Sequence, residues 1–277
     1  MAEIESRKRG RPRSFHPNTD STIIQSVDKA ITLLKVVSEG TGRSLSELSE
    51  LTAMPAASAY RALVTLQKHG MVNFDEDGQL WRIDVESFRI GSAFLANTSM
   101  VEQARPVMNS LMSKSGETAN LGLIAGGEVV FLSQVETHEP IRAFFRPGTH
   151  GSIHASGIGK ALFAYRPQKH AVELANSIQL KGFTDHTIQT TDELLQMRKE
   201  TLQRGFAIDD QERTMGMRCI AAPIFNSFGE AISAISVSGP TVRIDSQRIA
   251  EYGELVRIAA DEITRNIGGK VTSFLED

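Results

Sequence analysis

The stretch His-Ala-Ser-Gly-Ile-Gly-Lys, which begins at His154, has the residue types of an anion-binding loop. A nucleotide-binding phosphate loop needs a glycine five places before Gly159 and a serine or threonine after the lysine, but these positions hold His154 and Ala161. The nucleotide interpretation therefore fails. Ser156 can still cap a helix that begins at Gly157, whose first free N–H groups would attract any small anion. The alternative is that the glycines only permit close packing.

A catalytic interpretation would combine Cys219, His154 and Asp209 into a thiol-based site. Cys219 is the single cysteine of the chain, and it begins a predicted strand, where no helix N-terminus would lower the pKa of its thiol. A lone cysteine of this kind is more often buried or part of a pocket wall. We therefore expect no enzymatic activity. The histidine and acidic residues also show no metal-ligand spacing, so we expect no metal and no cofactor.

The composition is that of a globular chain with an uneven distribution of charge. A length of 277 residues suits about two domains. No apolar run is long enough to cross a bilayer, and the polar start lacks the apolar core of a secretory signal, so we expect a cytoplasmic protein without a membrane partner. The first 82 residues hold 11 basic and 10 acidic side chains, whereas the remainder holds 19 and 23. Because the chain as a whole is not basic, any positively charged surface must be confined to a small region.

Positive charge is concentrated in a basic arm, residues 1–20. The segment Arg-Lys-Arg-Gly-Arg-Pro-Arg at residues 7–13 carries five positive charges in seven residues. Its glycine and proline oppose helix formation, so Arg9, Arg11 and Arg13 can enter an A·T-rich minor groove, as the core of an AT-hook does. A solvated tail that only aids solubility is the alternative.

Residues 21–83 carry the pattern of a winged helix-turn-helix domain. A first helix is predicted from Thr22, because apolar residues recur there at helical spacing. The sequence Ser-Leu-Ser-Glu at Ser44 forms a capping box for a second helix, and Pro55 fits the first turn of a third, which places the helix-turn-helix at about 44–66. The residues predicted to face inward are Ile23, Val27, Ala30, Ile31, Leu34, Val37, Leu45, Leu48, Leu51, Ala59, Ala62, Leu63 and Leu66.

The third helix is predicted to present Ser58, Tyr60, Arg61 and Thr65 on its exposed side. Side chains of this kind can reach base edges in the major groove of DNA. A hairpin with an Asp-Gly turn follows as the wing, and its acidic tip is not expected to grip phosphate. A helical bundle that packs against another protein would share this periodicity but would give no reason for the arginine arm. We therefore expect a domain that binds double-stranded DNA.

A linker helix is predicted at residues 84–98. It has apolar residues on more than one side, including Phe88, Ile90, Phe94 and Leu95. One covered face would not bury them all, so we expect this helix to be partly buried in a homodimer.

Residues 99–270 alternate predicted strands and helices. Strand pairs interrupted by helices indicate an antiparallel sheet with helices, which gives the whole chain the fold class α+β. Strands are predicted at 119–124, 129–135, 141–145, 219–225 and 231–238. Helices are predicted at 102–114, from Gly157, near 167–177, at 191–204 and at 249–267.

Three motifs resemble the signature of the IclR family of bacterial transcription regulators. They are Gly-Phe-Ala-Ile-Asp-Asp-Gln-Glu from Gly205, Cys-Ile-Ala from Cys219 and Ile-Phe-Asn from Ile224. The order of parts agrees as well, with a winged helix-turn-helix, a linker helix and then a domain that would be a GAF-like effector-binding domain. The resemblance covers nearly the whole chain from Thr22 onward.

Further stretches are similar to one branch of that family, the glyoxylate-responsive regulators of allantoin use and glyoxylate assimilation. These are Lys-Arg-Gly-Arg-Pro at 8–12, Ser-Gly-Glu-Thr at 115–118, the stretch at 154–160, Met-Arg-Cys-Ile at 217–220 and Ala-Ile-Ser-Val-Ser-Gly-Pro at 234–240. The resemblance implies that a small 2-oxo acid contacts the backbone of Gly157 and Ile158. The side chains that it places around the acid are Asp209, Met217, Cys219, Ser236 and Ser238.

The chemistry of these residues suits a small acid. Ser236 and Ser238 are two apart on a strand, so they share a face, and their hydroxyls can donate to a carboxylate or an aldehyde oxygen. Asp209 fits beside an anion if it accepts hydrogen bonds from a hydrated aldehyde, or if burial keeps it protonated. Ile158 stands where the branch has alanine, which would narrow the site.

The sequence thus predicts a regulator that senses a small organic acid, with glyoxylate as the expected effector, and controls a catabolic operon. A homodimer, assembled as a dimer of dimers, would read an inverted-repeat operator. A repressor is favoured over an activator. A small-acid-binding module whose target is another protein, and a Cys219-dependent enzyme, are the alternatives.

Overall fold

The computed structural model describes residues 23–96 and 100–271, and it describes side chains over 23–91 and 100–271. Contacts divide the chain into two compact units, Met1–Phe94 and Leu95–Asp277. The basic arm, with the predicted minor-groove residues Arg9, Arg11 and Arg13, lies outside the described residues. Within the described part, no helix is both long and apolar enough to span a bilayer.

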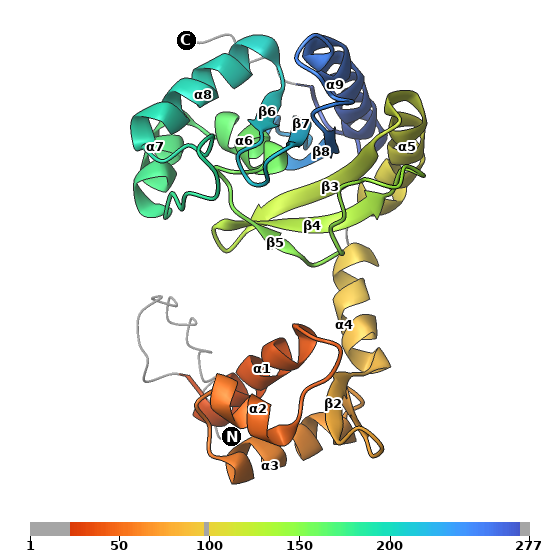
Figure 1. Cartoon of the computed structure of the whole chain (residues 1–277), viewed down its shortest axis with the longest axis vertical. Helices are drawn as coiled ribbons and strands as arrows, with labels where there is room; N and C mark the ends of the chain where they lie inside the picture. Colours follow the sequence, from red (N-terminus) through yellow and green to blue (C-terminus); the bar gives the residue numbers. More distant parts are fainter. Residues whose placement is uncertain (1–22, 97–99, 272–277) are drawn as a thin grey trace, which may run out of the picture. The chain divides into compact units, whose positions relative to one another are not determined.

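The first unit contains three helices and a two-stranded antiparallel wing, which are followed by the helix α4 (Figure 1). The capping box is present as predicted, because Ser44 accepts a hydrogen bond from the N–H of Glu47 and the Glu47 side chain accepts one from the N–H of Ser44. Leu33, Leu63 and Trp81 belong to its buried core. The elements are α1 Gln25–Ser38, α2 Leu45–Leu51, α3 Ala56–Lys68, β1 Val72–Asp75, β2 Leu80–Ile83 and α4 Val85–Ala96.

Part of the predicted interior of this unit is wrong. Ile23, just before α1, is 53% exposed, Val27 and Ile31 of α1 are exposed at 51% and 49%, and Leu51 of α2 is exposed at 55%. Helix α1 buries Val37, as predicted, and Leu33, which was not predicted to face inward. Helical spacing shows that an apolar stripe exists, but the face that becomes buried is decided by where α2 and α3 pack. The exposed apolar residues of α1 could therefore pack against another protein surface.

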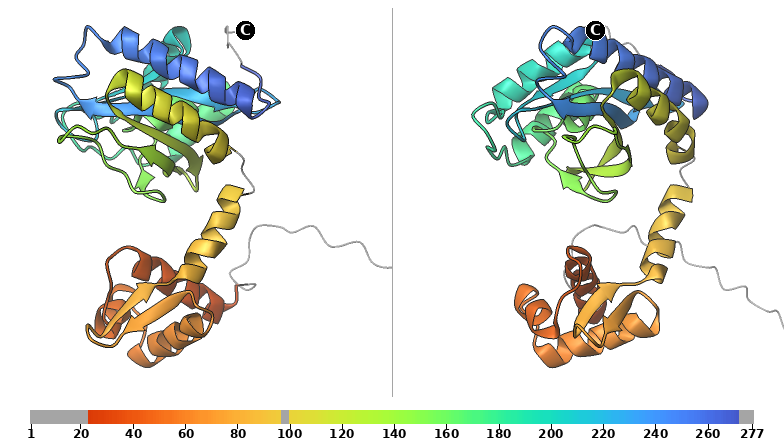
Figure 2. Two further views of the ribbon diagram at one scale, coloured as in Figure 1. Left: turned by 90° about the vertical axis from the view of Figure 1, so that its right-hand side faces the viewer. Right: turned by 45° about the vertical axis from the view of Figure 1, so that its right-hand side comes forward.

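The second unit is a six-stranded antiparallel sheet with helices on both faces (Figures 1 and 2). The strand order is β5-β4-β3-β8-β7-β6, with α5 and α9 on one face and α6 to α8 on the other. The α+β fold class is therefore confirmed. The elements are α5 Met100–Ser115, β3 Thr118–Ala125, β4 Glu128–Val135, β5 His150–Gly151, α6 Gly157–Ala164, α7 Gln168–Ser177, α8 Thr191–Arg204, β6 Ala207–Asp210, β7 Met217–Phe225, β8 Ala231–Pro240 and α9 Ile249–Asn266.

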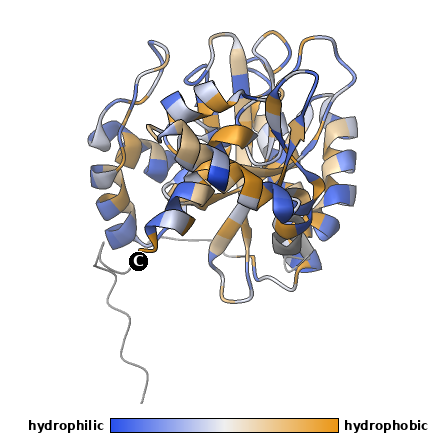
Figure 3. Cartoon of the chain, turned by 90° about the horizontal axis from the view of Figure 1, so that it is seen from below, coloured by the Kyte–Doolittle hydropathy of each residue, from blue (hydrophilic) through white to orange (hydrophobic). Residues whose placement is uncertain are grey.

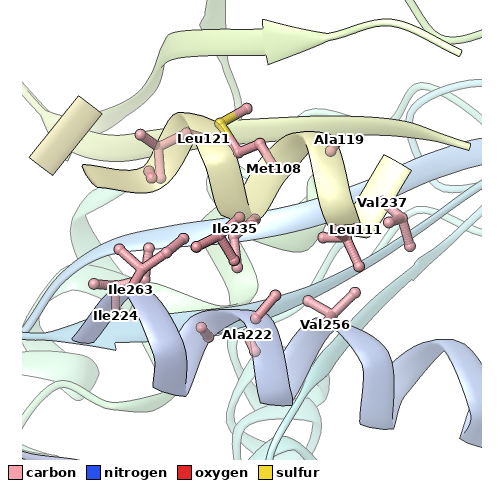
Figure 4. Close-up of a cluster of buried hydrophobic side chains, with 14 of the residues drawn as sticks. Met108, Leu111, Ala119, Leu121, Ala222, Ile224, Ile235, Val237, Val256 and Ile263 are labelled. Carbon is pink, nitrogen blue, oxygen red and sulfur yellow. The ribbon is translucent and has the colours of Figure 1, made fainter. Parts of the chain in front are cut away.

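The two faces of this sheet have different chemistry because side chains alternate along each strand. On β8, Ile235 and Val237 enter the hydrophobic core under α5 and α9 (Figure 4). Ser236 and Ser238 consequently point to the opposite face, which carries α6. The helices also carry hydrophobic and hydrophilic residues on different sides, as the colours of Figure 3 show. The face of the sheet under α5 and α9 is therefore apolar, whereas the face under α6, called the front face below, can present polar groups.

Two strand predictions in this unit need correction. Residues 141–145 are not a strand, because the edge of β4 pairs with His150–Gly151 instead, and Phe145 stacks on Phe131 with ring centroids 4.3 Å apart. The short strand β6 was not predicted, although it lies within the family signature. Four residues with two acidic members give little strand signal, and pairing with β7 makes the strand.

Candidate functional site

A cavity of about 410 Å³ lies on the front face of the sheet, where α6 begins. Six of the seven predicted effector-binding residues line it, namely Gly157, Ile158, Asp209, Met217, Cys219 and Ser238. Ser236 is fully buried and does not line the cavity, although it shares a face of β8 with Ser238. Residues more than 80 positions apart in sequence thus meet at one concave surface.

The N-terminus of helix α6 forms one wall of the cavity. Its predicted cap is confirmed, because Ser156 Oγ accepts a hydrogen bond of 3.1 Å from the N–H of Gly159. The first N–H groups of a helix have no carbonyl partner within it, and the helix dipole makes this end positive. Gly157 has no room for a side chain, since a Cβ there would lie 2.7 Å from the sulfur of Cys219. At Gly157 a ligand would therefore meet the backbone and not a side chain.

Ile158 occupies space beside the sheet. It is buried, and a Cβ on Gly122 of β3 would come within 3.3 Å of its Cδ1 atom. Because Gly122 has no side chain, the side chain of Ile158 packs directly against the backbone of β3.

Strand register places the polar side chains of the cavity next to one another. Asp209 of β6 pairs with Cys219 of β7, and Cys219 pairs with Ser238 of β8. Residues directly opposite in neighbouring strands point to the same face. A carboxyl, a thiol and a hydroxyl thus form one row across three strands.

A buried amide network on the neighbouring strands lies beside the serines. Asn120 of β3 donates to the hydroxyl of Ser238 at 3.2 Å and to that of Ser236 at 3.5 Å, while Gln134 donates to the amide oxygen of Asn120 at 2.7 Å. Because each serine oxygen accepts from Asn120, its own proton is directed elsewhere, toward the thiol or the cavity. Asn120 and Gln134 were missed from the sequence, where nothing local ties them to residues of β8.

Burial determines the protonation of the two titratable groups in this row. It raises the pKa of Asp209, opposed by the charge of Lys160 and by the N–H of Glu212, which donates to the Asp209 carboxylate at 3.0 Å. Burial, with the negative charge of Asp209, raises the pKa of the Cys219 thiol to about 11. The thiol therefore stays protonated near neutral pH.

The lysine of the opening stretch does not face the cavity. Lys160 is 1% exposed, and its ammonium donates to the backbone oxygen of Ile208 at 2.8 Å and to the carboxylate of Glu212. The stretch is therefore not a phosphate loop. Its lysine ties α6 to β6, the strand that carries Asp209.

The second candidate site is the exposed side of α3. Ser58, Tyr60, Arg61 and Thr65 are all exposed, and the ring of Tyr60 lies edge-on to Trp81 of the wing. Helical spacing puts Arg61 in the middle of the outward face, with Ser58 and Tyr60 on opposite flanks. Lys68 follows Arg61 on the same outward face, and sequence reasoning did not select it.

Comparison with protein families identifies this combination. The family described as the C-terminal domain of the bacterial transcriptional regulator IclR matches residues 92–265, and the IclR helix-turn-helix domain matches residues 26–76. The chain belongs to the IclR family of bacterial transcriptional regulators. It is therefore a DNA-binding regulator, and the relatives of this IclR-family chain are regulators rather than enzymes.

Full-length relatives and a solved structure agree with this assignment. The chain is 43% identical to the HTH-type transcriptional regulator BhcR of Paracoccus denitrificans over 94% of this chain and 95% of BhcR. It is 33% identical to the transcriptional repressor IclR of Escherichia coli over 95% of this chain and 97% of that protein. The crystal structure of the Thermotoga maritima IclR is similar with a TM-score of 0.73 and 28% identity, covering 89% of this chain and all of that one.

The geometry of this IclR-family chain also argues against the thiol-based catalytic site. The Nε2 atom of His154 lies 3.0 Å from the backbone oxygen of Lys181, and among the described residues no hydrogen bond joins His154 to Cys219. A protonated thiol without a base beside it is a poor nucleophile. Over the same described residues, no group of side chains is arranged to hold a metal ion.

Proposed function

We propose that this IclR-family regulator senses glyoxylate, or a closely related small 2-oxo acid, and controls a catabolic operon as a repressor in the cytoplasm. The observation that carries the proposal is the cavity itself, which joins a capped helix N-terminus to a row of hydroxyl, thiol and carboxyl groups. The similarity to a relative named a transcriptional repressor favours repression.

The acid would enter with its carboxylate toward α6. The N–H groups of Gly157 and Ile158, at the positive end of the helix, would bind the carboxylate oxygens. The hydroxyl of Ser238 would donate to the aldehyde oxygen, while the amide of Asn120, which donates to Ser238 and Ser236, holds that hydroxyl in place. Asp209 would accept from a hydrated aldehyde, or carry a proton itself.

We propose a homodimer, paired into a dimer of dimers on an inverted-repeat operator. Helix α4 exposes Val85 and Phe88, at 72% and 73%, and Ile90. Helix α1 exposes Val27 and Ile31 as well. Apolar surface of this extent is typically covered by a partner. The predicted contribution of Phe94 and Leu95 lies outside the described side chains.

DNA would be read by α3, with Arg61, Ser58, Tyr60 and Thr65 at base edges and the arginines of the basic arm in the flanking minor groove. Effector binding changes DNA affinity only if the DNA-bound and free forms bind the acid differently. Repression followed by release requires weaker acid binding by the DNA-bound form.

A footprint on the upstream region of the regulated operon tests this function. We expect protection of an inverted repeat by the wild-type chain and its loss when glyoxylate is added. The double variant Ser236→Ala, Ser238→Ala should protect the same bases but need at least about tenfold more glyoxylate, because hydrogen bonds to a charged ligand are lost. Ser177→Ala, at an exposed position of α7 outside the cavity lining, is the matched control. A wild-type footprint that glyoxylate leaves unchanged would rule out this effector.

The position of Asp209 predicts that acid binding depends on pH. A bound carboxylate raises the pKa of Asp209 further, so binding takes up a proton and affinity falls as pH rises through the pKa of the free protein, by up to one decade per pH unit. Calorimetric titration at a series of pH values, above and below neutrality, measures this slope. Asp209→Asn should abolish it. A slope that persists in Asp209→Asn would assign the proton to the neighbouring Glu212, and a flat wild-type profile would contradict the prediction.

A further inference from the structure

The proposed two-carbon acid would leave most of the cavity unfilled. A volume of about 410 Å³ has room for on the order of ten water molecules at about 30 Å³ each. From the polar row at Ser238 the lining extends to Phe131, Phe145 and three arginines. Besides the polar row, the cavity lining thus contains aromatic rings and cationic side chains.

One of these arginines has a charge that no acidic group balances. Arg142 pairs with Glu136 at 2.8 Å, and Arg218 forms a fork with the carboxylate of Asp210. Arg213 makes no ion pair among the residues that the structure describes. A cation that lines a ligand cavity without an acidic partner is suited to bind an anion.

Arg213 is also held in place. Its guanidinium lies over the ring of Phe183, 4.0 Å from the ring centroid, and that ring stacks on His154. The hydroxyl of Thr187 accepts from the N–H of Phe183 and donates to the backbone oxygen of Glu212, next to Arg213. Phe183 is therefore hydrogen-bonded through Thr187 to the segment that carries Arg213. Because the guanidinium is already held in place, less side-chain entropy is lost when it binds an anion.

We propose that Arg213 forms a subsite for a second carboxylate, the distal subsite, so that the cavity accepts longer 2-oxo acids. The inference rests on the proposed function, since the first carboxylate is placed at the start of α6. Arg213 lines the same cavity as Gly157 and Ser238, so the two ends of one ligand can reach these groups. Glyoxylate has a single carboxylate, which α6 would bind, so it would gain nothing from Arg213.

Calorimetric titration of the full chain with 2-oxoglutarate, 2-oxopentanoate and glyoxylate tests the subsite. The first two acids have the same carbon chain and differ only in the distal carboxylate. We expect the wild type to bind 2-oxoglutarate roughly tenfold more tightly than 2-oxopentanoate, as a charge-assisted hydrogen bond at a partly exposed site would give. Arg213→Gln should remove this preference and leave the affinity for glyoxylate unchanged. The exposed Arg146, outside the cavity lining, provides the control Arg146→Gln, which should keep the preference.

The outcomes separate this inference from the proposed function. Glyoxylate binding with equal affinities for the two five-carbon acids would overturn the distal subsite alone. A preference for 2-oxoglutarate that persists in Arg213→Gln would show that another group binds the second carboxylate. No binding of any of the three acids would overturn the proposed effector class and the subsite with it.

Discussion

We expect the substitution Lys160→Met to destabilise the effector domain by about 3–5 kcal/mol, the usual cost of removing one partner of a buried ion pair. Lys160 is 1% exposed and holds the carboxylate of Glu212, whose second oxygen, Oε2, is buried without a hydrogen-bond partner. Without the lysine this carboxylate would be left as an uncompensated buried charge. For a domain of this size the loss corresponds to a fall of roughly 10 °C in Tm, measured by scanning calorimetry of the full chain.

The effect of Lys160→Met should grow with pH. Burial raises the pKa of Glu212 to about 7 although Lys160 lowers it, so removal of the lysine raises that pKa further. Below pH 7 the glutamate is protonated in both proteins and the missing partner matters less. Above pH 7 only the wild type gains from a charged glutamate paired with lysine, so the deficit of the variant grows as pH rises. The double variant Lys160→Met, Glu212→Leu should recover most of the stability, because apolar pairs often replace buried ion pairs without loss. If the double variant lost as much as the single variant, the ion pair would not be the cause.

Deletion of residues 7–13 should weaken DNA binding by a hundredfold or more at about 0.15 M salt, because the segment carries five positive charges. The slope of log affinity against log salt should become shallower by about 4–5, since each charge releases close to one counterion from the duplex. Fluorescence anisotropy with a labelled operator at several salt concentrations measures both quantities.

Two controls accompany the deletion. Replacement of Arg9, Arg11 and Arg13 by lysine keeps the charge, so it should preserve the salt slope while reducing the preference for A·T-rich flanks. Glyoxylate binding should be unchanged in both variants, because the arm is far in sequence from the effector cavity. An unaltered salt slope after the deletion would show that the arm is only a solvated tail.

Local signals in the sequence predicted most of the elements and one part of the site. The capping box at Ser44, the cap at Ser156 and the left-handed Gly205 at the end of α8 all involve groups within a few residues of one another. Such hydrogen bonds depend on a few neighbouring residues and form largely regardless of the rest of the fold. The period of two in β8 likewise predicted that Ser236 and Ser238 share a face.

The tertiary structure decided what depends on pairing between distant segments. It placed Asn120 beside the two serines, turned Lys160 away from the cavity, and left 141–145 outside the sheet while adding β6. Register and the choice of a buried face are set by contacts between residues far apart in the chain, and single-segment patterns do not specify them. The sequence by itself determined the helix caps, the amphipathic stripes and the basic arm. Only the packed sheet decided which side chains surround the cavity, because only the pairing of β3, β6, β7 and β8 brings residues from these distant segments together.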